Sequence, residues 1–222
     1  MTQVTPVVFV VDDDISVRES LDLLIQHAGW RAEMCSSAGE FLDRARPLVP
    51  SCLVLDVSLP DLNGLELQKR IAAGQLELPI IFITGHGDVP MSVRAMKAGA
   101  VEFLTKPFDD DVLIAAIGHS LTLSEAALGG AVELRALQDR YATLSDRENE
   151  VMTLVVAGKL NKQVGGELGI SEITVKAHRG RVMRKMEAGS LAELVTMAAR
   201  LGVSAAVKER ADRGLFRAQA DR

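Results

Sequence analysis

The stretch Cys52-Leu53-Val54-Leu55-Asp56-Val57-Ser58-Leu59-Pro60 constrains the fold more than any other part of the chain. Its apolar run predicts a buried strand of a parallel sheet. Pro60 cannot donate to a strand ladder, so the strand should end near Asp56. Ligands of open α/β sheets bind at the carboxyl ends of the strands, which is where Asp56 would stand. On this stretch alone, an Asp that only caps the following loop fits equally well.

Four more candidate strands alternate with helical patterns over the first half of the chain. The strands are expected at residues 7–11, 30–34, 79–84 and 100–104, and the helices at 16–27, 37–44, 63–73, 89–98 and 109–123. Ser16 is expected to cap the first of these helices, and Phe41 and Leu42 to face the core from the second. This alternation predicts an α/β fold, a doubly wound five-stranded parallel sheet. Polar side chains at the strand ends should converge on one rim of the sheet: Asp12, Asp13, Asp56, Thr84 and Lys106.

These five side chains suit phosphoryl chemistry. Three carboxylates can hold a hard divalent cation, typically Mg²⁺, and a Thr hydroxyl and a Lys can bind phosphoryl oxygens. A carboxylate can also act as a nucleophile and become an acyl phosphate. The rim therefore predicts in-line phosphoryl transfer to Asp56, with Mg²⁺ and Lys106 neutralising charge on the transferred group.

Five short segments resemble the receiver domain of bacterial response regulators, which has a flavodoxin-like fold. They are residues 11–14, 55–56, 59–64, 84–87 and 103–108, and the resemblance covers residues 7 to 122. By this resemblance Asp56 is the phosphoacceptor. Asp13 is a direct Mg²⁺ ligand, Asp12 a water-mediated one, and the carbonyl of Ser58 completes the protein ligands.

The resemblance also implies how the site reports phosphorylation. Lys106 would contact the phosphoryl group, Thr84 would turn its hydroxyl toward it, and Phe103 would rotate inward. Ser58 and His86 would tune dephosphorylation. Phosphorylation would then shift the population toward a state in which the surface from 89 to 119 pairs with another copy. The bond between Lys106 and Pro107 is expected to be cis, as in the family.

The chain is acidic in its first part and basic in its last. Residues 1–122 carry 9 Lys and Arg against 17 Asp and Glu, whereas residues 145–222 carry 14 against 10. This asymmetry suggests different partners for the two parts, with nucleic acid as a candidate for the basic part. A length of 222 residues is comfortable for two domains.

Other features bear on the cellular setting. We find no apolar run long enough to span a bilayer and no basic segment followed by an apolar one at the N-terminus. We therefore expect a cytoplasmic protein with no membrane partner. Cys35 and Cys52 make no disulfide framework and are expected to be small buried hydrophobes in a reducing compartment.

Residues 123–143 form a candidate linker between the two parts. Its larger apolar residues recur at near-helical spacing: Leu128, Val132, Leu134, Leu137 and Tyr141. Gly129-Gly130 interrupts this pattern and could kink or break a helix. A passive tether and a partly helical spacer both fit, and the spacing favours the spacer.

The last part of the chain is predicted to be all helical. Helices are expected over residues 145–157, 161–168 and 172–187 and from residue 190, each opened by a capping side chain: Ser145, Asn161, Ser171 and Ser190. Two short helices, a tight turn and a third, basic helix make a helix-turn-helix pattern. The third helix is expected to bury Ile173, Val175, Val182 and Met186, and its cations suit phosphate contacts. A solvated charged face is the alternative for such a helix taken alone.

Residues 144–202 resemble the DNA-binding domain of the LuxR family. The matching residues are Leu144-Ser145, Arg147-Glu148, Val151, Gly158, Asn161-Lys162, Leu168-Gly169-Ile170-Ser171, Thr174-Val175-Lys176 and His178. The resemblance implies that the third helix enters the major groove and that the fourth helix dimerises. Lys176, Ala177 and Gly180 would face bases, and a second group would lie nearer the phosphates: Thr174, His178, Arg179 and Arg184.

Glycines depart from the family pattern at two places. Gly165-Gly166 lies in the second helix, where the family usually has Ala at the first position, and Gly180 lies in the third. Each Gly costs about 1 kcal/mol relative to Ala inside a helix. These departures bear on local helix stability and on base specificity.

Together the resemblances identify the chain as a two-component response regulator of the FixJ/NarL type and not an enzyme. They imply a receiver domain at 1–122, a helical linker at 123–143, a LuxR-type helix-turn-helix domain at 144–203 and a tail at 204–222 without an assigned function. A sensor histidine kinase would phosphorylate the protein. The phosphorylated homodimer would bind promoter DNA and could contact RNA polymerase.

Two other hypotheses about the function are possible. An aspartyl-phosphate hydrolase of the haloacid dehalogenase type also uses a strand-end Asp and Mg²⁺, but it places an acid two residues after the nucleophile. This chain has Ser58 there, and such a hydrolase leaves residues 144–202 unexplained. The last domain could also act through protein contacts alone.

Overall fold

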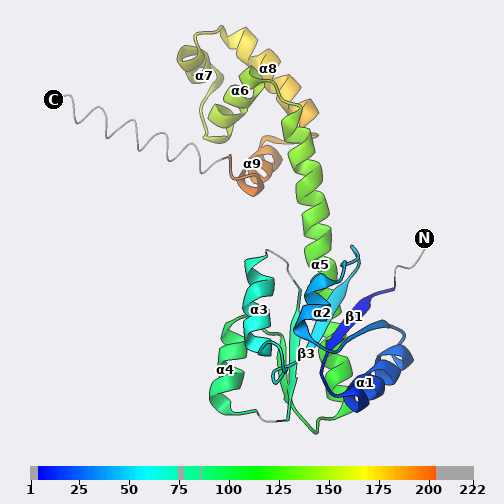
Figure 1. Cartoon of the computed structure of the whole chain (residues 1–222). Coiled ribbons are helices and arrows are strands. Elements are labelled where there is room, and N and C mark those ends of the chain that lie inside the picture. Colours follow the sequence, from blue (N-terminus) through cyan, green and yellow to red (C-terminus); the bar gives the residue numbers. More distant parts are fainter. Residues whose placement is uncertain (1–4, 75–77, 86, 204–222) are drawn as a thin grey trace, which may run out of the picture. The chain divides into compact units, whose positions relative to one another are not determined.

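The computed structural model describes residues 5–74, 78–85 and 87–203. The chain divides into two compact units, Met1–Gly130 and Ala131–Arg222 (Figure 1). Each unit is described by itself below. His86 and the tail at 204–222, both named in the sequence analysis, lie outside the described residues.

Unit 1 contains the predicted five-stranded parallel sheet. The strands are β1 (Val7–Val11), β2 (Arg31–Cys35), β3 (Ser51–Asp56), β4 (Ile80–Thr84) and β5 (Glu102–Thr105). All neighbours pair in parallel, in the order β2-β1-β3-β4-β5. This order is that of a doubly wound, flavodoxin-like sheet, whose direction of winding reverses between β1 and β3. The predicted fold class is confirmed.

Helices cover both faces of this sheet. Alternate residues of a strand point to opposite faces, so β1 gives Val8 to one core and Phe9 to the other. The first core is closed by α1 (Ile15–His27) and by the first part of α5 (Asp110–Ala142). The second core is closed by α2 (Ala38–Asp43), α3 (Gly64–Ala73) and α4 (Val89–Lys97). Cys35 and Cys52 are buried in these cores, as predicted.

Two local predictions for unit 1 were wrong. The N-cap of α1 is Asp14, whose side chain accepts a hydrogen bond from the backbone N–H of Ser16. Ser16 itself lies inside the first turn of that helix. Leu42, predicted to face the core from α2, is 39% exposed, because α2 is short and buries Ala38 and Phe41 instead.

The helix α5 is continuous over 33 residues. It passes through Gly129 and Gly130 without a break, so the predicted linker is helical and the predicted interruption is wrong. A Cβ atom at either glycine would meet no atom within 4 Å, so neither position requires glycine for steric reasons. Helix formation continues here because a glycine in a helix is unfavourable by only about 1 kcal/mol.

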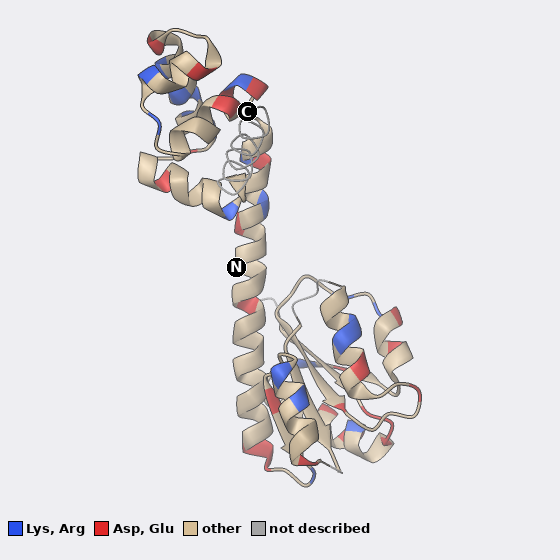
Figure 2. Ribbon diagram, turned by 90° about the vertical axis from the view of Figure 1, so that its left-hand side faces the viewer, with Lys and Arg blue, Asp and Glu red and all other residues tan. Residues whose placement is uncertain are grey.

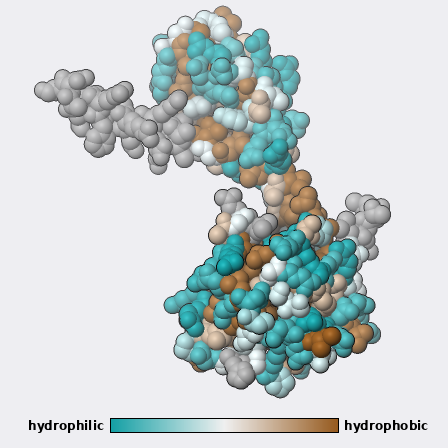
Figure 3. All heavy atoms as spheres, viewed as in Figure 1, coloured by the Kyte–Doolittle hydropathy of each residue, from teal (hydrophilic) through white to brown (hydrophobic). Residues whose placement is uncertain are grey.

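The same helix bears on the expectation that no apolar run could span a bilayer. Among the described residues, α5 alone is long and apolar enough to do so, with a mean hydropathy of 1.4 over its most apolar 18-residue window. The expectation that no segment has the length and apolar composition of a membrane span was therefore wrong. Leu113, Ile117 and Leu121 of this helix are buried in unit 1, although only 28% of the apolar window is buried. Figure 3 shows apolar atoms, in brown, on the exposed stretch of α5.

Unit 2 packs the end of α5 against four further helices. They are α6 (Asp146–Val156), α7 (Asn161–Leu168), α8 (Glu172–Lys185) and α9 (Leu191–Arg200). Leu137 of α5 enters a core with Met152, Met186 and Leu194. Ser145 caps α6 as predicted, and with Glu148 it forms a capping box.

Two residues of unit 2 differ from the prediction. Leu160, and not Asn161, is the N-cap of α7, and its backbone N–H donates to Oε1 of Gln163 at 2.8 Å. Ile173, predicted to be buried, is 80% exposed. The other three predicted core residues of α8 and its end, Val175, Val182 and Met186, are buried.

The two glycines of α7 have different surroundings. A Cβ at Gly165 would lie 2.7 Å from the carbonyl oxygen of Ile170, so the turn approaches the helix closely at this position. A Cβ at Gly166 would meet nothing within 4 Å. Gly165 thus helps α7 to pack against the turn, whereas Gly166 costs helix stability without a packing benefit.

Candidate functional site

Three carboxylates meet at the carboxyl ends of β1 and β3. These strands are neighbours, with Val11 paired to Leu55, so the residues that follow them also lie together. Asp12, Asp13 and Asp56 each offer an oxygen atom, and these atoms lie within 4.8 Å of one another. Asp12 is fully buried and Asp56 is 6% exposed, whereas Asp13 is exposed. The sheet therefore brings the predicted acids to one place, at the point where the winding reverses.

Lys106 joins two of these acids. Its Nζ donates to Oδ2 of Asp12 at 2.6 Å and to Oδ2 of Asp56 at 2.8 Å. The backbone N–H of Lys106 donates to the carbonyl of Thr84 at 2.8 Å, which ties the end of β5 to the end of β4. The peptide bond from Lys106 to Pro107 is cis, as expected.

Burial and charge act against each other in this cluster. Burial raises the pKa of Asp12, and its hydrogen bond with Lys106 only partly offsets that effect. Burial also acts to lower the pKa of Lys106, but the hydrogen bonds and charges of Asp12 and Asp56 outweigh it and leave the pKa raised. A protonated Lys106 is thus held among carboxylates that would otherwise repel one another.

Backbone N–H groups fix the orientation of the two buried carboxylates. Oδ1 of Asp12 accepts from the backbone of Asp14, and Oδ1 of Asp56 accepts from the backbone of Ser58, each at 2.9 Å. In addition, the guanidinium of Arg18 donates to the carbonyl oxygen of Asp12 at 2.6 Å. The sequence analysis missed Arg18. No pattern of residue types in the sequence points to this contact, because it depends on the packed loop after β1.

Gly64, the first residue of α3, lies against the backbone of Asp56, and the sequence analysis also missed this role. A Cβ at this position would lie 2.5 Å from the backbone oxygen of Asp56 and 3.0 Å from Cα of Val57. The N–H of Gly64 donates to the carbonyl of Val57 at 2.9 Å. Only a residue without a side chain lets α3 begin so close to the strand end.

The predicted switch residues lie on the neighbouring strands β4 and β5. Thr84 is fully buried at the end of β4, and Phe103 on β5 is half-buried, with its ring 6.1 Å from that of Phe82. A Cβ at Gly87 would lie 2.8 Å from Cγ2 of Thr105 and 3.0 Å from the Phe103 ring. Phe103 therefore packs directly against the loop that follows Thr84.

The donor set fits a hard divalent cation. It consists of oxygen atoms from three carboxylates, two of them buried and oriented by backbone hydrogen bonds. Mg²⁺ prefers such oxygen ligands and keeps several waters, for which the exposed side of Asp13 leaves room. Within the described residues, Asp12, Asp13 and Asp56 are the carboxylates that could hold the ion.

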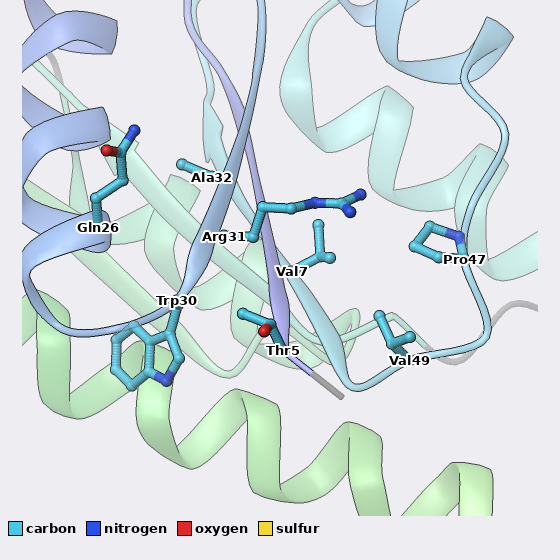
Figure 4. Close-up of a pocket in the computed structure, with 8 residues that line it drawn as sticks. All are labelled: Thr5, Val7, Gln26, Trp30, Arg31, Ala32, Pro47 and Val49. Carbon is cyan, nitrogen blue, oxygen red and sulfur yellow. The ribbon is translucent and has the colours of Figure 1, made fainter. Parts of the chain in front are cut away.

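A pocket at the opposite ends of the strands has different chemistry. It has a volume of about 510 Å³ and is lined by residues near the amino ends of β1 and β2, with Thr5, Trp30 and Arg31 among them (Figure 4). Its lining contains no carboxylate. It therefore lacks the groups that hold a divalent cation, and the acidic rim remains the candidate for phosphoryl chemistry.

The helix α8 provides a second candidate site, in unit 2. Figure 2 marks the Lys and Arg residues in blue, and those of α8 are Lys176, Arg179, Arg181, Arg184 and Lys185. Of the residues predicted to contact DNA, five are exposed: Thr174, Lys176, Ala177, Gly180 and Arg184. His178 and Arg179 are half-buried, and Arg179 donates to Oδ1 of Asn161 at 3.2 Å. These two are therefore less available to a partner than the other five.

The C-terminal end of α8 is anchored by a partly buried ion pair. Nζ of Lys185 donates to Oε2 of Glu148 at 2.6 Å and to the carbonyl of Thr143 at 2.8 Å. The hydrogen bond from Lys185, together with that from the backbone of Ser145, lowers the pKa of Glu148 to about 2. Arg140 of α5 also donates to the carbonyl of Met186, just after α8. These contacts fix the orientation of α8 within unit 2.

Comparison with known families agrees with both sites. Residues 8–118 match the family described as response regulator receiver domain, and residues 142–198 match the family described as bacterial regulatory proteins, luxR family. The chain therefore belongs to the two-component response regulators that carry a LuxR-type DNA-binding domain. Both resemblances found in the sequence are confirmed.

Individual relatives match across both parts of the chain. Nodulation protein W of Bradyrhizobium diazoefficiens is 50% identical over 199 residues, which cover 90% of this chain and 88% of that protein. The transcriptional regulatory protein FixJ of the same species is 44% identical and covers 88% of this chain and 96% of its own. The solved structure of the response regulator StyR has a TM-score of 0.77 at 46% identity, with 89% and 100% coverage. The family is one of transcriptional regulators.

Proposed function

We propose that a sensor histidine kinase phosphorylates Asp56 and that phosphorylation promotes homodimerisation and sequence-specific binding of promoter DNA. The observation that carries the proposal is the contact of Lys106 Nζ with both Asp12 and Asp56. It places a cation, two oriented carboxylates and the exposed Asp13 around one small space. That arrangement is suited to accept a phosphoryl group, whose charge needs such neutralisation.

The chemical step follows from these contacts. A carboxylate oxygen of Asp56 attacks the phosphorus of a phosphohistidine, the P–N bond breaks, and its electron pair stays on the imidazole. The backbone N–H of Ser58 holds the other oxygen of Asp56, so the attacking oxygen is oriented. Lys106 then contacts a phosphoryl oxygen. When bound by Asp12, Asp13, Asp56 and the carbonyl of Ser58, Mg²⁺ would supply further neutralisation of charge.

Phosphorylation would reach the rest of unit 1 through Thr84 and Phe103. The hydroxyl of Thr84 would turn toward the phosphoryl group, and Phe103 would rotate into the space that this movement leaves. Phe103 packs beside the loop at Gly87 and close to Phe82. A small movement of that loop would therefore shift the population between the outward and the inward position of the Phe103 ring. The surface from residue 89 to 119 would then pair with a second copy. Ser58 and His86 would set the rate of dephosphorylation.

Unit 2 would bind the operator through α8. Lys176, Ala177 and Gly180 would face the bases of the major groove, and Thr174 and Arg184 the phosphates. His178 and Arg179 would also lie near the phosphates, and Arg179 would reach them by exchanging its hydrogen bond to Asn161 for one to a phosphate oxygen. The helix α9 would dimerise.

These roles set functional boundaries along the chain. We assign the receiver to residues 1–122, the linker to 123–143, the DNA-binding domain to 144–203 and a tail without an assigned function to 204–222. The protein acts in the cytoplasm, with no membrane partner, where its kinase and its promoter are both accessible. Contact with RNA polymerase would follow from binding at a promoter. The protein would not turn over a substrate as an enzyme does.

The test compares Asp56→Asn with wild type in the presence of Mg²⁺ and acetyl phosphate. Intact-mass spectrometry should detect one added phosphoryl group on the wild type and none on Asp56→Asn. Asp14→Asn is the matched control, because Asn can also cap α1 and residue 14 is not a proposed ligand. Phosphorylation of Asp56→Asn at the wild-type rate would contradict the proposal. Steady turnover of a phosphate ester would favour the hydrolase instead.

A further inference from the structure

Ile173 is the one large apolar side chain on the exposed side of α8, a helix that the structure describes in full. It is 80% exposed, whereas Val175 and Val182 are buried. With 3.6 residues per turn, positions 175 and 182 lie about 180° around the helix from position 173. Ile173 therefore points directly away from the core of unit 2.

The residues beside Ile173 on this face are small. Ala177 and Gly180 follow it at the spacing of one and two helical turns and are both exposed. A Cβ at Gly180 would meet no atom within 4 Å. Because these neighbours have little or no side chain, another molecule could approach the backbone of α8 closely on this face. Ile173 would then project toward that molecule.

The polar side chains around Ile173 have partners within the helix. The hydroxyls of Ser171 and Thr174 lie 2.8 Å apart in a hydrogen bond. Nζ of Lys176 lies 3.3 Å from a carboxylate oxygen of Glu172. The first turn of α8 thus presents an apolar group at its centre, flanked by polar groups that already pair with one another.

We propose that Ile173 contacts the C5-methyl group of a thymine in the major groove and so helps to select the DNA sequence. The inference rests on the proposed binding of DNA by α8. Residues in the N-terminal part of a recognition helix reach base edges. In the major groove thymine presents a methyl group, whereas the other bases present hydrogen-bonding groups that Ile cannot satisfy.

The experiment removes the methyl group from the DNA and the side chain from the protein. A duplex is selected from a random pool with the full-length protein treated with acetyl phosphate, and each thymine is then replaced singly by uracil. Fluorescence anisotropy should show, for at least one thymine in each half-site, binding by the wild type that is weaker by about fourfold, the value of one buried methyl group. Ile173→Ala should bind both duplexes equally at that position, and Ile173→Val should keep part of the preference.

Controls separate the possible failures. Val132→Ala removes another exposed apolar side chain, 70% exposed on α5, and should leave the thymine preference unchanged. If no duplex is selected, the proposed binding of DNA is wrong and the inference falls with it. If a duplex is selected but uracil is tolerated at every position, or Ile173→Ala keeps the wild-type preference, only the role of Ile173 is contradicted.

Discussion

Lys106 and its two carboxylate partners show how one side chain sets the character of the acidic rim. Asp12 is fully buried, and its charge is accepted there because Lys106 and the backbone of Asp14 both bond to it. The cation also lies where a phosphoryl group would need one. The same contact thus stabilises the resting protein and prepares the site for an anion.

Replacing Lys106 by Met should make the stability of unit 1 depend more strongly on Mg²⁺. Without the cation, Asp12 and Asp56 repel each other and lose their hydrogen bonds to Lys106, so the free energy of unfolding should fall by about 2 kcal/mol in EDTA. Added Mg²⁺ should recover more stability in the variant than in the wild type, because binding stabilises the folded state. Urea unfolding followed through Trp30, the single tryptophan of the chain, measures this.

Lys97→Met is the matched control for that measurement. Lys97 is an exposed lysine of α4 and should leave the response to Mg²⁺ unchanged. Equal Mg²⁺ responses of Lys106→Met and wild type would contradict the assignment of the rim as a cation site.

Glu148 should make the stability of unit 2 depend on pH. Its pKa in the folded protein is about 2, below the ordinary value of 4.5, because Lys185 and the Ser145 backbone bond to the carboxylate. The stabilisation is therefore complete above pH 4.5 and is lost as the pH falls toward 2. Glu148→Gln should lose about 2 kcal/mol at neutral pH and flatten the decline over this range. Hydrogen exchange of α6 and α8 peptides reports the change.

Glu167→Gln is the control for the pH experiment. Glu167 pairs with Lys159 at the surface, and exposed pairs contribute little. A pH profile of Glu148→Gln that follows the wild type between pH 4.5 and 2 would show that another group controls the stability of unit 2.

The sequence predicted the charged residues of the acidic rim better than the residues that hold the backbone around them. Asp12, Asp56 and Lys106 could be placed together because the carboxyl ends of parallel strands share one rim. Arg18 and Gly64 could not, because their roles depend on distances to the backbone oxygens of Asp12 and Asp56 that no pattern of residue types records. Those distances follow only from the packed loops.

Burial was also harder to predict at the ends of helices. Ile173 was assigned to the core because it is apolar, although its angle around α8 places it opposite Val175. Asp14 and Ser16 are both suitable N-cap residues, and the helix begins after Asp14, whose side chain accepts from the Ser16 N–H. Helix ends are where small differences in capping decide the boundary.

At the scale of elements, α5 is the feature that the residue pattern predicted least well. Gly129-Gly130 suggested a break, but helix formation on both sides continues through the pair. The N-terminal half of α5 packs on the sheet of unit 1, and Leu137 is buried in unit 2. Packing at both ends of a helix outweighs the low propensity of two residues between them.

Replacing Gly129 and Gly130 with Ala should stabilise α5 around this point by about 1 kcal/mol for each residue. There is space for both methyl groups, since nothing lies within 4 Å of either Cβ position. Hydrogen exchange of peptides covering residues 123–140 should become slower. Gly166→Ala, also in open space, should slow exchange in α7 alone, and unchanged or faster exchange near residue 130 would contradict the account of α5.

At the scale of the whole molecule, the two parts of the chain carry opposite net charge, and each has its own candidate site. The acidic first part holds a rim suited to a cation and a phosphoryl group, and the basic last part presents the cations of α8. Arg140 of α5 donates to the carbonyl of Met186, just after α8, and Lys185 of α8 donates to the carbonyl of Thr143, just after α5. The adjoining ends of α5 and α8 are therefore held together in unit 2. A change in how two copies associate could therefore alter how α8 meets DNA.

The central claim is that a phosphoryl group on Asp56 strengthens the binding of DNA. The most direct measurement is the dissociation constant of full-length protein for its selected duplex, at fixed salt, with and without acetyl phosphate. The account predicts that the phosphodonor tightens binding by the wild type by about tenfold, within the usual range of coupling between sites, and has no effect on Asp56→Asn. Equal affinities of the wild type with and without the phosphodonor would contradict it.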